Sequence, residues 1–578
     1  MSSSTRNVFL AVSTLLFVAV LAGVRLTSQT PAPAQSAPAD LVLRNGRIVT
    51  LDERTPNAEA IASRDGRIVA VGTNAEVGKL VGPNTQVIDL AGQFAMPGFI
   101  EGHGHFTGIG AGKLGLELMN TKSWDEIVHV VAEAVERAKP GQWIVGRGWH
   151  QEKWTSTPQP NVEGFPTHVS LDKVSPNNPV ILTHASGHAS FANAKAMELS
   201  KVTASTPNPN GGEILKDKSG QPTGLLRETA SGLIRRGVGE PPPTPEETEA
   251  RERRILELAD REVISKGITS FQDAGSSFET VNRIKRAIDQ SQMNVRLWVM
   301  IRGGNAESLK AGRVIGYGNQ MLTVRAIKIT ADGALGSRGA WLLEPYTDKA
   351  DSTGLATVPV DRMKTMAQDA LDAGYQVCVH AIGDRANREV LNIYEEAFKK
   401  NNRNGRDLRW RVEHAQHVSA ADIPRFGQLG VIASMQGVHC TSDAPWVEPR
   451  LGAKRAEEGA YVWQKLMKSG AVVTNGTDAP VEDVDPIASY YATVTRKASD
   501  GKVFYGDQKM TRLEALKSYT LSNAFAAFEE DVKGSLSLGK LADITVLTRD
   551  ITTVPDDEIR QAKVAYTIVG GKVVYKPQ

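Results

Sequence analysis

The sequence has little cysteine and little net charge. Only two of its 578 residues are cysteines, Cys378 and Cys440, and each lies in an apolar, strand-like context. We therefore expect two buried free thiols, with a disulfide between them as the alternative. The formal net charge of +2 at pH 7 argues against a nucleic acid bound by a basic surface. The 41% hydrophobic and 23% charged residues indicate a globular chain.

The one long apolar run lies near the N-terminus. Arg6 precedes residues 8–24, which are almost wholly apolar, and residues 27–38 are rich in Pro, Ala and Ser. The run is short for a membrane-spanning helix, so we interpret residues 1–38 as a secretory signal and linker, cleaved within 22–37. We expect a periplasmic or secreted protein; an uncleaved anchor in the inner membrane, and membrane contact through this segment alone, is the alternative. No cysteine follows the run, which excludes a lipid-anchored lipoprotein.

Strand–turn–strand patterns occupy both ends of the remaining chain. Residues 41–50 and 60–72 each hold two strand-like runs around an Asn-Gly or Asp-Gly turn. Residues 534–547 and 564–575 repeat the pattern near the C-terminus. We predict that segments 39–94 and 531–578 build one small β-sandwich, with the large domain of residues 95–530 inserted between them.

Apolar strand-like runs alternate with helical patterns in the large domain. There are eight such runs: residues 93–100, 268–272, 295–301, 324–330, 376–380, 409–414, 431–435 and 471–475. This alternation predicts an α/β fold, a (β/α)8 TIM barrel. An insertion over about residues 106–260 follows the first run, and large loops of this kind usually shape the substrate pocket.

The first predicted barrel strand leads into Gly-His103-Gly-His105. Side chains alternate along a strand, so these two imidazoles share a face and can bind one metal ion. Two ordinary loop histidines are the alternative for such an isolated pair. Further predicted strands also end in residues suited to a metal site: Lys328, His380, His414 and Asp478. Barrel active sites lie at the carboxyl ends of the strands, so the set predicts a metal centre there.

These motifs resemble those of the metal-dependent amidohydrolase superfamily. More narrowly, they resemble its amidohydrolase family 3 branch, which includes N-substituted formamide deformylase-like enzymes. The resemblance covers about residues 40–578. The motifs that carry it are Pro97-Gly-Phe-Ile-Glu-Gly-His-Gly-His105, Lys328-Ile-Thr-Ala-Asp-Gly-Ala-Leu-Gly-Ser337, Val379-His-Ala-Ile-Gly-Asp-Arg-Ala386, Glu413-His-Ala-Gln416, Thr477-Asp-Ala-Pro480 and the C-terminal Gly534 to Asp543. They are specific to the superfamily and much less specific about the substrate.

The resemblance implies one or two divalent metal ions, with zinc expected from the histidine-rich ligand set. One ion would be held by His103, His105 and Asp478, and the other by His380 and His414.

Lys328 occupies the place where the superfamily often has a carboxylated lysine that bridges the two metals. A free ammonium has no lone pair to offer a metal, whereas a carbamate has oxygens. The alternative is an unmodified lysine that forms an ion pair with Asp332 or Asp478.

The implied reaction is hydrolysis of an amide-type, non-peptide C–N bond of a small molecule. A metal lowers the pKa of bound water to about 7, and the resulting hydroxide attacks the carbonyl. Asp478 would carry the proton from the water to the leaving amine. The alternatives are an ester or carbamate hydrolase, a deaminase on the same barrel, or a catalytically silent binding scaffold. Lysine at the fourth strand favours the hydrolase over mononuclear deaminases.

Substrate contacts have weaker candidates. His184 and His188, in the insertion, are similar to a Gly-His element of the branch, and a structural role is the alternative for each. Neighbouring insertion residues and one cation after the fourth strand complete the set: Arg227, Glu228 and Arg338. An arginine there suits a substrate carboxylate; pairing with a nearby aspartate is the alternative. The sequence leaves the substrate and the oligomeric state open, a homo-oligomer included.

Overall fold

The computed structural model describes residues 37–577, and the chain from Pro38 onward forms one compact unit. The predicted signal segment, except for its last two residues, lies outside the described residues. Within the described part, no helix combines the length and the hydrophobicity needed to cross a bilayer. Cys378 and Cys440 are both buried and free, as expected.

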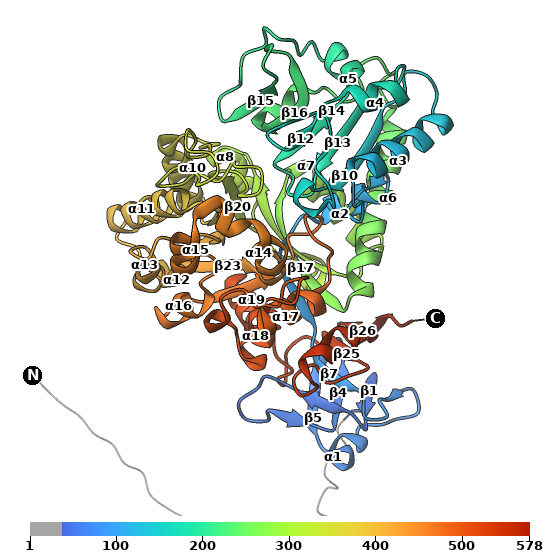
Figure 1. Ribbon diagram of the computed structural model, residues 1–578. Coiled ribbons are helices and arrows are strands. Elements are labelled where there is room, and N and C mark those ends of the chain that lie inside the picture. Colours follow the sequence, from blue (N-terminus) through green and yellow to red (C-terminus); the bar gives the residue numbers. More distant parts are fainter. Residues whose placement is uncertain (1–36, 578) are drawn as a thin grey trace, which may run out of the picture. The chain divides into compact units, whose positions relative to one another are not determined.

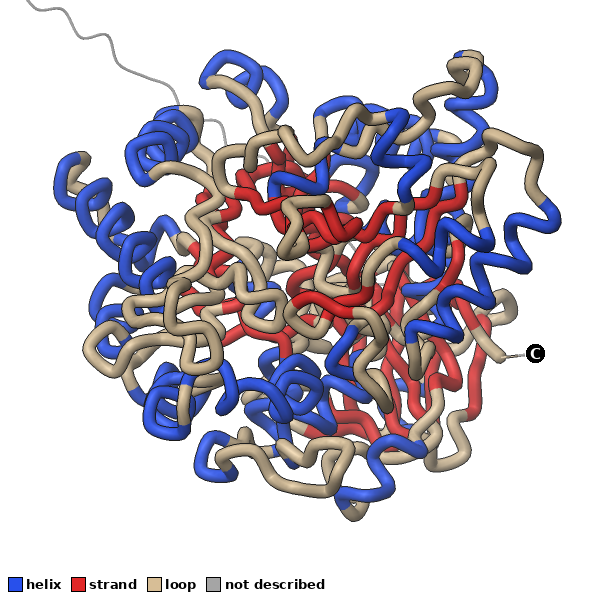
Figure 2. The backbone as a smooth tube through the Cα atoms, turned by 45° about the horizontal axis from the view of Figure 1, so that its top comes forward, coloured by secondary structure: helices blue, strands red, loops and turns tan. Residues whose placement is uncertain are grey.

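Eight parallel strands form a nearly closed barrel, which confirms the predicted TIM barrel (Figures 1 and 2). Their order around the barrel is β8 (Phe99–Gly104), β17 (Ile268–Ser276), β18 (Arg296–Arg302), β20 (Leu322–Thr330), β21 (Gln376–Ala381), β22 (Arg411–His414), β23 (Ile432–Gln436) and β24 (Val473–Gly476). The last strand packs against the first, and Asp478 N donates to His103 O at 2.8 Å across that seam.

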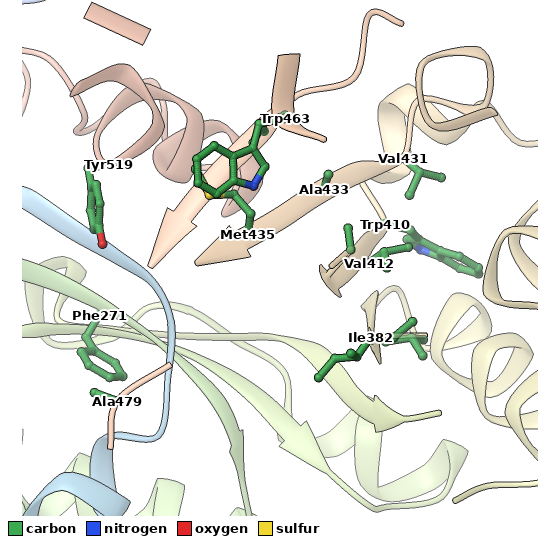
Figure 3. Packing of buried hydrophobic residues seen from close by; sticks show 14 of the residues in the cluster. Phe271, Ile382, Trp410, Val412, Val431, Ala433, Met435, Trp463, Ala479 and Tyr519 are labelled. Atoms are coloured by element: carbon green, nitrogen blue, oxygen red, sulfur yellow. The ribbon is translucent and has the colours of Figure 1, made fainter. Parts of the chain in front are cut away.

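Helices, most of them amphipathic, cover the outside of the barrel. They include α6 (Pro245–Ser265), α7 (Phe278–Asp289), α10 (Val360–Asp372), α11 (Asp384–Lys400) and α17 (Pro486–Thr495). In α11 the buried residues Val390, Tyr394 and Phe398 recur every four positions, which places them on one face. Trp410 packs edge-on against Tyr394 with ring centroids 4.9 Å apart. Figure 3 shows Trp410 in this core with Val412 and Val431.

The first predicted strand, residues 93–100, is two strands in the structure. β7 (Phe94–Pro97) pairs with β2 (Arg47–Val49) and β25 (Ile544–Leu547) in a separate sheet, and β8 begins the barrel. Gly98 joins them where a Cβ would lie 2.2 Å from Thr269 Oγ1. Only glycine fits where the two segments come this close. The run passes from one sheet to the other without a polar residue, so its pattern reads as a single strand.

Two further sheets pack on each other and contain both ends of the described chain. One has the order β5 (Arg67–Gly72), β4 (Ala60–Arg64), β1 (Leu41–Arg44) and β6 (Gln86–Asp89). The other has the order β27 (Lys572–Tyr575), β26 (Val564–Val569), β25, β7, β2 and β3 (Asn57–Ala58). Leu43 and Ile68 of the first sheet share a buried cluster with Ile544 and Ile568 of the second.

The insertion forms a sheet of its own. Its strand order is β15 (Gly212–Lys216), β16 (Pro222–Glu228), β14 (Ala189–Ala192), β13 (Val180–His184), β10 (Ile144–Trp149) and β9 (Leu116–Glu117). Helix α3 (Trp124–Arg137) packs on it through Ile127 and Val131, which share a core with Leu182. The chain leaves the barrel through α2 (Phe106–Gly112) and returns through α6, and these two helices contact each other.

Candidate metal centre and active site

The six predicted metal ligands lie together at the carboxyl ends of five barrel strands. His105 Nε2 and His103 Nε2 are 3.2 and 3.5 Å from Asp478 Oδ1. The ring centroids of His103 and His414 are 4.7 Å apart, and those of His414 and His380 are 4.4 Å apart. Lys328 completes the cluster, because its Nζ lies 3.2 Å from His103 Nε2. Residues separated by up to 375 positions therefore face one small volume.

Two overlapping groups of donor atoms are compact enough for a metal ion. His103, His105 and Asp478 form one, and His414, His439 and Asp478 form the other; within each group the ligand atoms lie within 4.8 Å of one another. The first is the set that the sequence predicts. The second contains His439, from α14 (Gly437–Leu451), where the resemblance implied His380. Asp478 belongs to both groups and is the point where they meet.

Glu413 holds His103 in one tautomer. His103 Nδ1 contacts Glu413 Oε2, and both side chains are fully buried. The carboxylate accepts the Nδ1 proton, which leaves the lone pair of Nε2 directed at the cluster. Arg411 Nε, 2.6 Å from Glu413 Oε1, keeps that carboxylate ionised. Burial lowers the pKa of His103 to about 4, so its imidazole is neutral at neutral pH.

His414 is oriented in the same way, by an amide. Its Nδ1 lies 2.7 Å from Gln436 Oε1, so Nδ1 donates and Nε2 faces the cluster. Neighbouring strand residues normally point to opposite faces, yet Glu413 and His414 both reach the barrel interior. His414 has φ +75° and Ala415 φ +43°, and this left-handed turn at the strand end is what brings both inside.

Several buried polar atoms of the cluster have no hydrogen bond. They are Asp478 Oδ1, His380 Nε2 and His439 Nε2. Burial alone would raise the pKa of Asp478, but the imidazoles of His105, His103 and His414 hold it well below its ordinary value. An ionised carboxylate and neutral imidazoles with unsatisfied lone pairs are the donor set of a divalent cation. The residues present therefore fit a metal.

Lys328 is buried beside His103 and has no ion pair with either expected aspartate. Asp332 instead accepts hydrogen bonds from the backbone N–H groups of Ile382, Gly383 and Trp341 at 3.0, 2.7 and 2.9 Å. It therefore ties the end of β21 to the loop after β20. Burial lowers the pKa of Lys328 to about 8, so the neutral amine, a minor form at pH 7, is far more populated than for an exposed lysine.

A cavity of about 560 Å³ opens over the cluster. The insertion supplies one wall through Arg147, His188 and Glu228, and the barrel supplies the rest, including Arg302 and Lys328. A second, smaller cavity of about 50 Å³ shares Asp478 and His380 with the first as lining residues.

Two of the five weaker candidates reach the large cavity. His188 Nδ1 lies 2.7 Å from Glu228 Oε2, and its ring is 4.9 Å from that of His380. Burial alone would lower the pKa of His188, but Glu228 outweighs it and raises that pKa. His184 lines only the small cavity, where its ring nitrogens contact Ser186 Oγ at 2.8 Å and Gln151 Oε1 at 3.0 Å.

The two arginines among those candidates do not line either cavity. Arg227 lies on the other face of β16, where it contacts Glu163 at 2.8 Å and Glu213 at 2.5 Å. Its neighbour Glu228 takes the cavity side because strand residues alternate. Arg338, with φ +61°, turns away from the strand end to pair with Asp348 at 2.9 Å.

Two kinds of residue in the site were not predicted from the sequence: Glu413, which orients a metal ligand, and Arg302, a cation that lines the cavity. Glu413 stands directly before His414, and Arg302 ends the third barrel strand, so their positions were the available signals. Glu101, which had no predicted role, is fully buried and accepts from Thr477 N across the seam between β8 and β24. Burial raises the pKa of Glu101 to about 8, and its contact helps to close the barrel.

Comparison with known proteins agrees with this geometry. The model of the amidohydrolase family matches residues 86–575. The chain is 33% identical to Protein LONG AFTER FAR-RED 3 of Arabidopsis thaliana, over 95% of this chain and 94% of that one. It is 28% identical to the N-substituted formamide deformylase of Arthrobacter pascens, over 93% and 98%. An uncharacterized metal-dependent hydrolase from Pyrococcus furiosus superposes with a TM-score of 0.67 at 26% identity, covering 89% of this chain and 100% of that chain.

Proposed function

The chain belongs to the amidohydrolase family and is a metal-dependent hydrolase, and on that premise we propose that it hydrolyses an amide-type, non-peptide C–N bond of a small molecule. One observation carries the proposal: buried Asp478 Oδ1 has no hydrogen bond, although two imidazole nitrogens lie 3.2 and 3.5 Å away. Its relative from Arthrobacter pascens, an N-substituted formamide deformylase, supports a C–N bond as the target.

We propose that His103, His105 and Asp478 hold one divalent ion, and that His414 holds a second with His380 or His439. Zinc is the metal that such a set favours. A divalent ion there supplies Lewis acidity and lowers the pKa of a coordinated water to about 7. Glu413 prepares His103 for this role, because it accepts a hydrogen bond from Nδ1–H and so leaves the lone pair of Nε2 for the ion.

Asp478 moves the proton. Its pKa lies well below the ordinary value, so its carboxylate is ionised and able to accept a proton from the attacking water. The water oxygen then bonds to the substrate carbonyl carbon, and the C–N bond breaks. Asp478 returns the proton to the leaving nitrogen, which departs as a neutral amine. Asp478 reaches the large and the small cavity alike, which allows both transfers from one position.

We propose that Lys328 carries a carboxylate on Nζ in the active protein. The neutral amine attacks CO₂, an N–C bond forms, and one proton leaves to solvent. Burial and the lowered pKa of about 8 favour the neutral amine that this reaction needs. Intact-protein mass measurement at neutral pH should show the added CO₂, and Lys328→Met should lack it. An unmodified mass in the fully active protein would exclude the carbamate.

The N-terminal segment supports a proposal about location. We propose that the protein is exported and that residues 1–38 supply the signal and linker, with membrane contact only where the segment is retained. N-terminal sequencing of protein from fractionated cells tests this. An intact first residue in cytoplasmic protein would overturn it.

Metal analysis with an activity assay tests the proposed function. Purified protein should contain one to two divalent ions per chain, lose activity when a chelator removes them, and regain it with Zn²⁺. The assay uses a panel of N-formyl and N-acetyl amides, cyclic amides and matching esters. Activity indifferent to the chelator would contradict a metal-dependent reaction, and cleavage of esters alone would contradict the C–N bond.

A further inference from the structure

The large cavity is lined by two arginines that form no ion pair with a described acidic side chain. Arg147 and Arg302 both line it. Among residues 37–577, no aspartate or glutamate oxygen lies within the 4.0 Å of an ion pair to either guanidinium. Arg296 and Arg411 of the barrel do contact a carboxylate, Asp543 at 2.7 Å and Glu413 at 2.6 Å. Arg496, also buried, donates within the described chain only to the backbone carbonyls of Phe504 and Tyr461, but it does not line the cavity. Two arginines without an ion pair in the wall of a cavity over the metal centre are available to bind an anion.

Arg302 lies at the cavity end of a barrel strand. It ends β18, and in the register of the barrel its direct neighbour on β20 is Lys328. The guanidinium makes one hydrogen bond, from Nη2 to Ala274 O at 3.3 Å, which leaves most of its five donors free. Arg302 is exposed, so those donors face the cavity solvent.

Arg147 is positioned by backbone carbonyls. Its Nη2 donates to Ala185 O at 2.9 Å, and its Nε donates to Pro480 O at 3.4 Å. These bonds orient the planar group without cancelling its charge. Its Nη1 has no partner among the described atoms and lies near Gly187, where the absence of a side chain leaves space. A pre-oriented, uncancelled guanidinium is the arrangement that binds a carboxylate.

The acidic residues of the cavity are already engaged. Glu228 accepts from His188, and Asp478 belongs to the metal centre. We propose that the substrate carries a carboxylate, bound by Arg302 and Arg147, so that the enzyme acts on N-acylated amino acids or similar carboxylate-bearing amides. This rests on the proposed amide hydrolysis. A carbamate on Lys328 would place a negative charge beside Arg302, so Arg147, on β10 of the insertion, is the arginine whose role is independent of that modification.

Matched substrates that differ only in charge test this assignment. The probes are the N-formyl and N-acetyl derivatives of leucine and phenylalanine, each as the free acid and as the carboxamide, with zinc-loaded protein. We expect kcat/KM at least about tenfold higher for the free acids, since one lost charged hydrogen bond is worth about that factor. Arg302→Gln and Arg147→Gln should each raise KM for the acids at least fivefold and leave the carboxamides within twofold.

Arg286→Gln is the control, because Arg286 pairs with Glu249 on the exposed side of the helices and should change neither series. Equal turnover of acids and carboxamides, or an undiminished preference in both cavity variants, would overturn the carboxylate site while amide hydrolysis stands. If no compound is hydrolysed, amide hydrolysis fails instead. Calorimetric titration with the same acids and carboxamides then decides the site: tighter binding of the acids supports it, and no preference refutes it.

Discussion

The barrel histidines and the insertion histidines border the same cavities but differ in how many ring nitrogens are engaged. His103 and His414 each use Nδ1 on a buried protein partner outside the cluster and direct Nε2 at the cluster, where the Nε2 of His103 contacts Lys328 Nζ at 3.2 Å. His184 uses both nitrogens, on Ser186 and Gln151. His188 stands between these cases, with Nδ1 on Glu228.

This difference separates chemical from structural histidines. An imidazole can bind a metal or a substrate only through a nitrogen that the protein leaves unengaged. The barrel supplies such nitrogens because its strand ends converge on one space. In the insertion, each side chain belongs to one face of a sheet that packs on its other face. Of the described insertion histidines, His188 is the one that lines the large cavity. Substitutions that act on one region and spare the other test this division.

Asp478→Asn should have the largest effect. The amide keeps the size and one ligand oxygen but cannot accept the proton, so we expect kcat to fall by about 10³-fold. Metal content, measured by elemental analysis, should remain above half of the wild-type value. Near-normal turnover would show that another group moves the proton.

Glu413→Gln should lower the metal affinity, because Glu413 orients His103 through its Nδ1. Loss of a carboxylate that orients a metal-binding histidine typically lowers metal affinity by about 10- to 100-fold. Competition against a chelator of known affinity measures this. Because the change also leaves Arg411 without its partner, Gln436→Leu provides a second test: it removes the partner of His414 with no change of charge. Unchanged metal affinity in both folded variants would contradict the orienting role.

His188→Gln and His184→Gln form a pair that compares the two kinds of insertion histidine. His188 lines the large cavity, and loss of its charged bond to Glu228 should lower kcat/KM about tenfold. His184→Gln should leave kcat/KM within about twofold and lower stability by about 1 kcal/mol, since its bonds join protein groups. A larger fall in kcat/KM for His184→Gln than for His188→Gln would contradict the division between a structural and a cavity-lining histidine.

Arg227→Met should have the smallest effect on activity and a clear effect on stability. We expect an unchanged kcat and a free energy of unfolding lower by about 2 kcal/mol. This is less than the cost of breaking a fully buried ion pair, because both glutamates are partly exposed. Burial alone would raise the pKa of Glu163, but Lys349 and Arg227 lower it to about 2. That lowered pKa stabilises the fold above the ordinary value of 4.5, and the contribution is lost as the pH falls toward 2.

The stability gap between wild type and Arg227→Met should therefore narrow as the pH falls from 5 to 3. Thermal unfolding across this range measures it. A gap that widens on acidification would show that the pair stabilises the fold in another way.

The spacing of apolar residues along the chain was enough to predict the barrel. The residue types at the predicted strand ends were enough to select His103, Lys328, His380 and Asp478 as candidate metal ligands. Eight buried parallel strands read as apolar runs, and topology forces their carboxyl ends together. His439 lies three residues beyond the end of β23, in the first turn of α14, and only the structure showed that it joins His414 and Asp478. The structure also revealed the change of sheet at Gly98, which depends on the close approach of Thr269.

The sequence by itself determined which elements form and which strand ends carry metal-binding side chains, because both depend on local periodicity and residue type. Only the tertiary structure decided which histidine ring nitrogens face the metal site and which face of the insertion sheet meets the cavity. It also decided that Arg147 and Arg302 line the cavity without an ion pair. Arg302 and Arg338 both follow barrel strands, yet one faces the cavity and the other pairs with Asp348. That choice depends on the backbone turn and the partner within reach, and both are set by contacts between distant segments.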